Sequence, residues 1–203
     1  MGSNARHPVL VDTDALIAVA NTELWPAITE TLTLTTTNVC LQELTHHIRE
    51  TSEYAADGTQ DNWVYEGSKA ARQPFEDESN GAFTVVPCVP RPHGEDAGEE
   101  SLRREIVQHP DEYTHAILMD KHGRIALNRA FESAETAGQA VAPPFLLYLL
   151  YDADACTKAE FCRACGELLE GEGWTGYQAV EAAWNAIPIN CSEFLPDDLL
   201  PDE

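Results

Sequence analysis

The chain has 203 residues, 43% of them hydrophobic, which suits one α/β domain with additions or a domain with a small appendage. Its 35 acidic and 12 basic residues give a net charge of −23, which repels nucleic acid in dilute buffer. The polar start and the short apolar runs predict neither a signal peptide nor a membrane span of roughly 20 residues. We therefore expect a cytoplasmic protein without membrane association.

The acidic surface is poor in lysine as well as rich in carboxylates. Only three of the basic residues are Lys, against nine Arg. At molar salt the screening length falls to about 3 Å, so such a surface no longer repels itself and serves solvation. The composition resembles that of cytosolic, halophilic archaeal proteins. An ordinary acidic mesophilic protein is the alternative.

Strand and helix patterns alternate along residues 1–150, which we predict to form one domain. The predicted strands are 9–11, 31–35, 83–88, 116–119 and 139–142. The predicted helices are 15–20, a segment capped by Thr37 or Asn38, 96–108 and 124–131. Residues 51–82 are polar and weakly patterned, and we interpret them as a helical or looped insertion. The alternation predicts a three-layer α/β/α fold with a mostly parallel central sheet.

Residues 151–203 are predicted to be a helical C-terminal extension that ends in an acidic tail. Thr157-x-x-Glu160 is a capping box that opens one helix. A second helical stripe consists of Tyr177, Val180, Trp184 and Ile187. Both helices need an apolar surface to pack on, and we expect the first domain to provide it.

The six cysteines allow a disulfide, a metal site or simple packing. Cys162-x-x-Cys165 has the spacing of a zinc knuckle, yet no second Cys or His pair stands at zinc spacing. Phe161, Cys165, Leu168 and Leu169 also lie on one helical face. Packing within a helix in a reducing compartment is therefore the favoured interpretation.

Two acids each follow a predicted apolar strand. Asp12 comes directly after residues 9–11, and Asp120 comes directly after residues 116–119. In an open α/β sheet, ligands bind beyond the carboxyl ends of the strands, so both carboxylates should reach the same edge. Unpaired buried charge is costly, and two like charges repel, so a bound cation explains the pair best. Mg²⁺ and Mn²⁺ prefer oxygen ligands and promote displacement at phosphodiesters.

The predicted helix at 96–108 distinguishes two neighbouring acids. Glu99 shares the helical face of Leu102 and Ile106, so it points toward the core side. Glu100 instead precedes Arg103 and Arg104 by three and four residues, the spacing of a surface ion pair. Glu99 is therefore the better candidate for a metal site. Glu43 flanks the apolar stripe of its own helix and has less support. The seven His show no metal-binding pattern, and His46 and His47 are interpreted as helix-surface residues.

The four acids stand in segments that resemble the motifs of PIN domains. Val9-Leu-Val-Asp-Thr-Asp-Ala-Leu-Ile looks like the opening motif, and Leu41-Gln-Glu-Leu places Glu43 where the family carries its second acid. Gly98-Glu99 is similar to the start of the third-motif helix in one subgroup. Ala116-Ile-Leu-Met-Asp120-Lys-His-Gly-Arg124 resembles the fourth motif. The resemblance covers about residues 8–150. Two positions depart from it: Asp14 stands where Ser or Asn is commoner, and Lys121 where several relatives have a second Asp.

The resemblance implies a nuclease that cleaves single-stranded or structured RNA with water and Mg²⁺ or Mn²⁺. The implied catalytic residues are Asp12, Glu43, Glu99 and Asp120. The implied metal ligands are Asp12, Glu99 and Asp120, and Glu43 binds the metal or holds its water. Five basic residues between Arg103 and Arg129 lie beside the predicted pocket. We assign substrate contacts to Thr13, Lys121 and Arg124, whereas Arg103 and Arg104 either guide phosphates or form local ion pairs.

Alternative functions and partners remain open at this point. The chain could be a catalytically degenerate PIN-like scaffold, or a related metal-dependent DNA nuclease or phosphatase. Besides RNA, the expected partners are an antitoxin or a processing partner and a second copy of the chain. Both a toxin–antitoxin role and a processing role agree with the length.

Overall fold

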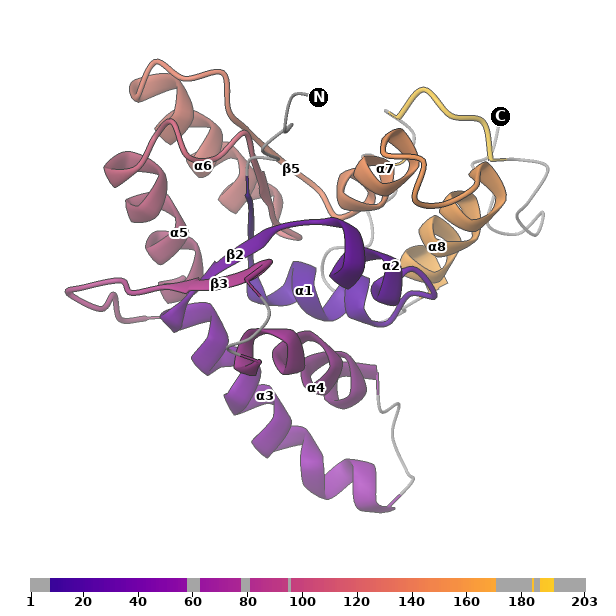
Figure 1. Cartoon of the computed structure of the whole chain (residues 1–203). Helices are drawn as coiled ribbons and strands as arrows, with labels where there is room; N and C mark the ends of the chain where they lie inside the picture. The colour runs from indigo at the N-terminus through magenta and orange to yellow at the C-terminus, as the bar shows by residue number, and fades with distance from the viewer. Residues whose placement is uncertain are drawn as a thin grey trace.

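A five-stranded parallel sheet forms the centre of the computed structural model, which describes residues 8–57, 63–77, 81–94, 96–170, 184 and 187–191 (Figure 1). The strand order is β3-β2-β1-β4-β5, and every pairing is parallel. The strands are β1 (Val9–Val11), β2 (Leu34–Thr37), β3 (Phe83–Val86), β4 (His115–Ile117) and β5 (Gln139–Val141). The central position of β1 places the residue after it, Asp12, between the ends of β2 and β4.

Helices cover both faces of the sheet. The described helices are α1 (Thr13–Ala20), α2 (Trp25–Thr31), α3 (Asn38–Asp57), α4 (Trp63–Glu76), α5 (Ala97–Gln108), α6 (Lys121–Ser133), α7 (Pro144–Asp152) and α8 (Lys158–Glu170). Leu10 packs in one apolar cluster with α5 and α6, whereas Val9 and Val11 pack in a larger cluster with α1, α2, α7 and α8. Since alternate strand residues point to opposite faces, these clusters are the two cores of a three-layer α/β/α fold, which confirms the predicted fold class (Figure 1).

Four of the predicted strands have boundaries that need correction, and in β5 the change is only that the strand ends at Val141. The strand predicted at 31–35 starts later, at Leu34, because Thr31 is the last residue of α2, a helix that we did not predict. The alternation of Leu with Thr near position 31 suggested a strand, but Pro26 in the first turn favours the helix. β3 ends at Val86, just before Pro87, and β4 ends at Ile117, two residues before Met119. The described part of 51–82 before β3 is mainly helical.

The start of α3 is held by two neighbouring side chains. Thr37 Oγ1 accepts a hydrogen bond from the Cys40 amide at 3.2 Å, which confirms Thr37 as the cap. Asn38, the alternative cap, instead accepts a hydrogen bond at Oδ1 from the Cys88 amide at 2.9 Å. These bonds fix the first turn of α3 to the end of β2 and to the chain leaving β3.

The C-terminal region adds α8 to the larger core. The predicted capping box is confirmed: the Thr157 amide donates to Glu160 Oε2 at 2.7 Å, and the Glu160 amide donates to Thr157 Oγ1 at 3.3 Å. The predicted stripe of α8 is buried in the larger cluster. The second predicted helix falls mostly outside the described residues, although Trp184 is buried in the same cluster. The division of the chain at residue 150 stays a prediction.

A disulfide joins Cys162 of α8 to Cys191, 29 residues later. Helix packing, the role predicted for the Cys162 segment, is therefore only part of its role. Cys191 stands in a segment without a recognisable motif, so spacing gave no sign of the pairing. Cys40, Cys88, Cys156 and Cys165 are free thiols. Among the described residues, no helix is both long and apolar enough to cross a membrane.

Gly67 allows α4 to approach α1 closely, and its replacement should weaken the fold. A Cβ at this position would lie 2.8 Å from Ile17 O and still closer to Asn21 Nδ2. Asn21 Nδ2 donates to Ile17 O and to Trp63 O, so it bridges the two helices. We expect Gly67→Ala to destabilise the protein by about 1–3 kcal/mol, measured by thermal unfolding at molar salt.

Gly81→Ala is the matched control, because a Cβ there meets nothing within 4 Å. It should leave the melting temperature unchanged or raise it slightly. Equal melting temperatures for Gly67→Ala and wild type would contradict the close approach of α4 to α1.

Candidate acidic site

A pocket of about 300 Å³ lies at the carboxyl end of β1, where the start of α1, one side of α3 and the start of α5 line it. Parallel pairing places Val11 beside Ile117, so Asp12 and the segment leading to Asp120 leave the sheet at the same edge. The lining includes three of the four predicted acids. The lining residues are Asp12, Thr13, Asp14, Glu43, His46, His47, Asp96, Gly98 and Glu99. Asp120 is outside this lining, but its charge raises the pKa of both Asp14 and Glu99.

Asp12 is the most buried acid of the site, with 8% of its surface exposed. Its amide donates to Ile117 O at 3.0 Å, and its extended backbone ends β1 and begins α1. Burial raises the pKa of the Asp12 carboxyl well above its usual range, and Asp14, Glu43 and Glu99 raise it further. A hydrogen bond from the Thr13 backbone acts in the opposite direction. The ionised form of Asp12 is therefore destabilised without a cation.

Glu43 is held by a hydrogen bond from Thr13. Thr13 Oγ1 lies 2.6 Å from Glu43 Oε2 and 3.3 Å from Cys40 O. This contact links the first turn of α1 to α3 and directs Glu43 toward Asp12. The hydroxyl of Thr13 thus positions Glu43, whereas a contact of Thr13 with substrate stays a prediction. The Glu43 assignment, which rested mainly on the family resemblance, thus has a geometric basis.

Two glycines make room for the carboxylates of the site. A Cβ at Gly98 would lie 2.7 Å from Glu43 Oε2, so the start of α5 packs directly against that side chain. A Cβ at Gly123 would lie 2.5 Å from Glu99 Oε1, so Glu99 lies against the first turn of α6. Helices α3, α5 and α6 therefore converge through contacts between glycines and acids.

Asp120 differs from Asp12 although both follow a strand. It is exposed, and its Oδ1 accepts hydrogen bonds from the His122 and Gly123 amides, both at 2.9 Å. The argument that an acid at this position is buried and unpaired is therefore wrong for Asp120. The carboxylate caps α6, and the positive end of the helix dipole stabilises its charge.

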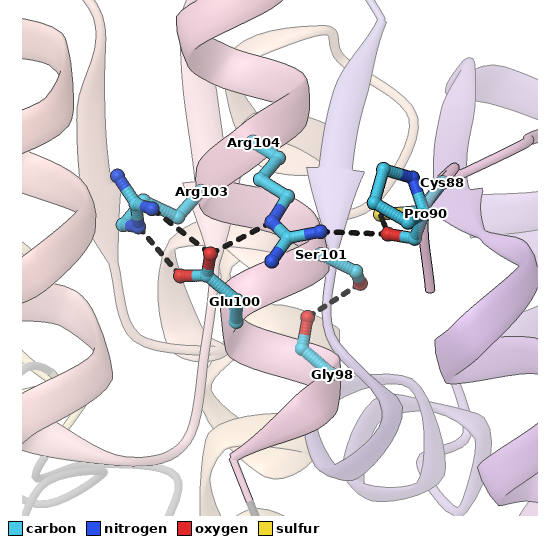
Figure 2. A network of polar contacts seen from close by, with 7 residues as sticks. All are labelled: Cys88, Pro90, Gly98, Glu100, Ser101, Arg103 and Arg104. Atoms are coloured by element: carbon cyan, nitrogen blue, oxygen red, sulfur yellow. Dashed lines mark hydrogen bonds and ion pairs between the residues drawn. The ribbon is translucent and has the colours of Figure 1, made fainter. Parts of the chain in front are cut away.

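Three of the predicted basic residues, Arg103, Arg104 and Arg124, already have protein partners. Arg124 Nη1 donates to Leu118 O at 3.0 Å and to Met119 O at 2.5 Å, so Arg124 braces the segment before Asp120. Figure 2 shows Glu100 between Arg103 and Arg104, which confirms the predicted surface ion pair. Hydrogen bonds from the two guanidinium groups lower the pKa of Glu100 to about 2, although burial partly opposes them. Lys121 is exposed at the start of α6.

Several polar residues of the pocket were not predicted as site residues from the sequence. For Asp14, a role in the site was left undecided; in the structure burial raises its pKa, and the charge of His47 opposes that shift. His47 stands one helical turn after Glu43 on α3, and this spacing was the available signal. His46 was correctly placed on the helix surface, where it pairs with Glu50 at 3.0 Å. Asp96 was taken only as a helix start.

The donor chemistry fits a hard divalent cation. Five carboxylates line the pocket, and in the described parts of the chain none of them forms an ion pair with Lys or Arg. They come from the start of α1 (Asp12 and Asp14), from α3 (Glu43) and from the start of α5 (Asp96 and Glu99). Asp12, Asp14 and Glu99 each have a raised pKa. Burial is the largest cause in each case, and the charges of neighbouring acids add to it. A cation bound by oxygen ligands would relieve this repulsion.

Comparison with known families agrees with this geometry. The model of a family described as "Halobacterial PIN domain" matches residues 1–201. The chain belongs to this PIN-domain family. Its fold is therefore nuclease-like, the predicted resemblance is confirmed, and the halobacterial description agrees with the acidic composition. The match continues past residue 150 and includes the region of α7 and α8. Searches among curated proteins and among solved structures return no match.

Burial of Asp12 should make the metal-free PIN domain less stable as the pH rises. The pKa of Asp12 is about 3.9 in the unfolded chain and higher in the folded protein, so between these two pKa values the folded state binds more protons than the unfolded state. The free energy of unfolding therefore falls as the pH rises from the unfolded pKa toward the folded pKa. Asp12→Asn should raise the melting temperature by several degrees at neutral pH in the presence of a chelator, with a smaller gain near pH 4.

Glu100→Gln is the control of opposite sign for this experiment. The lowered pKa of Glu100 contributes stability that is present above the unfolded value and lost as the pH falls toward about 2. Loss of the Glu100 carboxylate should lower the melting temperature only slightly at neutral pH, because exposed ion pairs contribute little to stability. A neutral-pH melting temperature of Asp12→Asn below wild type would refute the proposed repulsion.

Proposed function

We propose that this PIN domain is a divalent-metal-dependent endoribonuclease. The observation that carries the proposal is the convergence of Asp12, Glu43, Glu99 and the nearby Asp120, none of which is ion-paired with Lys or Arg in the described parts of the chain. PIN-family membership supports nuclease chemistry as the use of such a site. RNA as the substrate and Mg²⁺ or Mn²⁺ as the cofactor follow from the resemblance and from the oxygen donors.

In this proposal, each acid has a role that its position supports. Asp12, Glu99 and Asp120 would hold the metal ion, which would supply an activated water and offset charge on the phosphate. Glu43 has its Oε2 bonded to Thr13, so Oε1 is the atom that accepts a hydrogen bond from the attacking water. Arg124 keeps the backbone before Asp120 in place, and exposed Lys121 contacts a substrate phosphate.

The site acids should be needed for cleavage of RNA. Asp12→Asn and Glu99→Gln should each reduce Mn²⁺-dependent cleavage of a labelled RNA at molar salt by at least about 100-fold, because each removes a metal ligand. Glu100→Gln should retain activity, since Glu100 pairs with Arg103 and Arg104. Parallel assays on single-stranded DNA and a phosphomonoester identify the substrate class. Equal cleavage by wild type and Asp12→Asn, or no binding of divalent metal, would refute the proposal.

The two site glycines provide a test that leaves every carboxylate in the sequence. Gly98→Ala pushes on Glu43, and Gly123→Ala pushes on Glu99. Because the displaced atoms are the ends of side chains, the fold should survive while the carboxylate oxygens shift away from the new Cβ. We expect Mn²⁺ affinity, measured by calorimetry, to fall about 10-fold for either variant. Gly81→Ala should bind Mn²⁺ like wild type, and unchanged affinity in both site variants would contradict the proposed ligand geometry.

A further inference from the structure

The thiol of Cys40 lies directly beside the acidic site. Cys40 is in the first turn of α3 and is fully buried. Its Sγ lies 3.9 Å from Asp12 Oδ1 and is directed at that carboxylate. One donor atom from each of Asp12, Cys40 and Glu43 can be chosen so that all three lie within 4.8 Å of one another. Sulfur is thus part of the potential donor set together with the two carboxylates.

The surrounding hydrogen bonds fix Cys40 in this position. Its carbonyl oxygen faces Thr13 Oγ1, and its amide is bonded to Thr37 Oγ1. Ser101 Oγ lies 4.0 Å from the sulfur, but Ser101 also contacts Thr37 Oγ1 and Gly98 O, both at 2.6 Å (Figure 2 shows the bond to Gly98). A free buried Cys is usually a small apolar group. Cys40 does belong to the smaller apolar cluster, but its sulfur also faces a buried carboxylate.

We propose that Cys40 provides a sulfur ligand with which Asp12 and Glu43 capture Zn²⁺ in competition with the ion used for catalysis. This inference rests on the proposed metal site but not on nuclease activity. Ligands about 2.0–2.3 Å from a tetrahedral zinc ion lie roughly 3.3–3.8 Å apart. The separation of 3.9 Å between Cys40 Sγ and Asp12 Oδ1 is close to this range, and donor atoms up to 4.8 Å apart would have to move together by up to about 1 Å. Thiolate and imidazole ligands favour zinc, whereas an all-oxygen site suits Mg²⁺ or Mn²⁺.

The binding step balances without any redox partner. The S–H bond of Cys40 breaks, its proton passes to water, and a bond forms between sulfur and zinc. Asp12 and Glu43 are then held by zinc and no longer serve the catalytic ion and its water. Zn²⁺ should therefore inhibit RNA cleavage, because it occupies the two acids that cleavage requires.

Cd²⁺ is a suitable probe because a bond between cadmium and thiolate absorbs in the near ultraviolet, whereas carboxylate ligands do not. Metal-free protein is titrated with Cd²⁺ in a concentrated, chloride-free salt. Wild type and Cys88→Ser should show a band that saturates with one bound ion, and Cys40→Ser should lack it. Cys88 is the matched control because it is also a buried free thiol, and its Sγ contacts Pro90 O.

Competition experiments then measure the metal preference. We expect Zn²⁺ affinity to fall at least about 10-fold in Cys40→Ser, while Mn²⁺ affinity changes less than about 3-fold, because only the softer ion gains from sulfur. Zn²⁺ should inhibit Mn²⁺-dependent cleavage by wild type more strongly than by Cys40→Ser. If Cys40→Ser does not fold, Glu43→Gln is used instead. It keeps the thiol, and its band should require about 10-fold more Cd²⁺.

The outcomes separate this inference from the proposed function. Mn²⁺ binding without a band that depends on Cys40 overturns the sulfur ligand and leaves the proposed metal site intact. A band that persists in Cys40→Ser, or one in Glu43→Gln at wild-type Cd²⁺ concentrations, also overturns it. Absence of any divalent binding overturns both proposals. A band that depends on Cys40, without RNA cleavage, supports the sulfur ligand and contradicts the nuclease alone.

Discussion

Burial of the Asp12 carboxyl at the end of the central strand is the constraint on which the rest of the site depends. β1 is paired on both sides, so the residue that follows it has little freedom to turn toward solvent. The neighbouring acids add repulsion to the desolvation of this group. The rest of the fold must supply the stability that this arrangement loses, and the two apolar cores on either side of β1 do so.

Convergence of the other acids depends on contacts that bring helix ends close together. Thr13 fixes Glu43 relative to Asp12 through a bond between α1 and α3. Gly98 and Gly123 then allow the first turns of α5 and α6 to approach Glu43 and Glu99. Glycine is therefore needed in the Gly-Glu pair and in the Asp-Lys-His-Gly segment because a larger residue would displace a carboxylate of the site. Glu43 thus packs against the start of α5, and Glu99 packs against the start of α6.

Local patterns in the sequence predicted the elements better than the contacts between them. Strand 9–11 and the capping box at Thr157 depend on neighbouring residues, and both are confirmed. The separation of Glu99 from Glu100 rested on helical periodicity, and the ion pairs of Glu100 agree with it. The disulfide to Cys191 joins distant segments, which spacing cannot reveal. Asp120 shows a further limit, since an acid after a strand can equally cap the next helix.

Several basic side chains of this acidic PIN domain are occupied by contacts within the protein, which limits their use in binding a phosphodiester. Arg103 and Arg104 are engaged by Glu100, and Arg124 donates to Leu118 and Met119. These three arginines therefore serve the fold. Under the proposed function, a bound divalent ion must then supply much of the attraction for the phosphate. High salt screens the net charge of −23 over long distances but weakens a directly coordinated contact much less. A metal-centred site is thus the arrangement that suits an acidic surface.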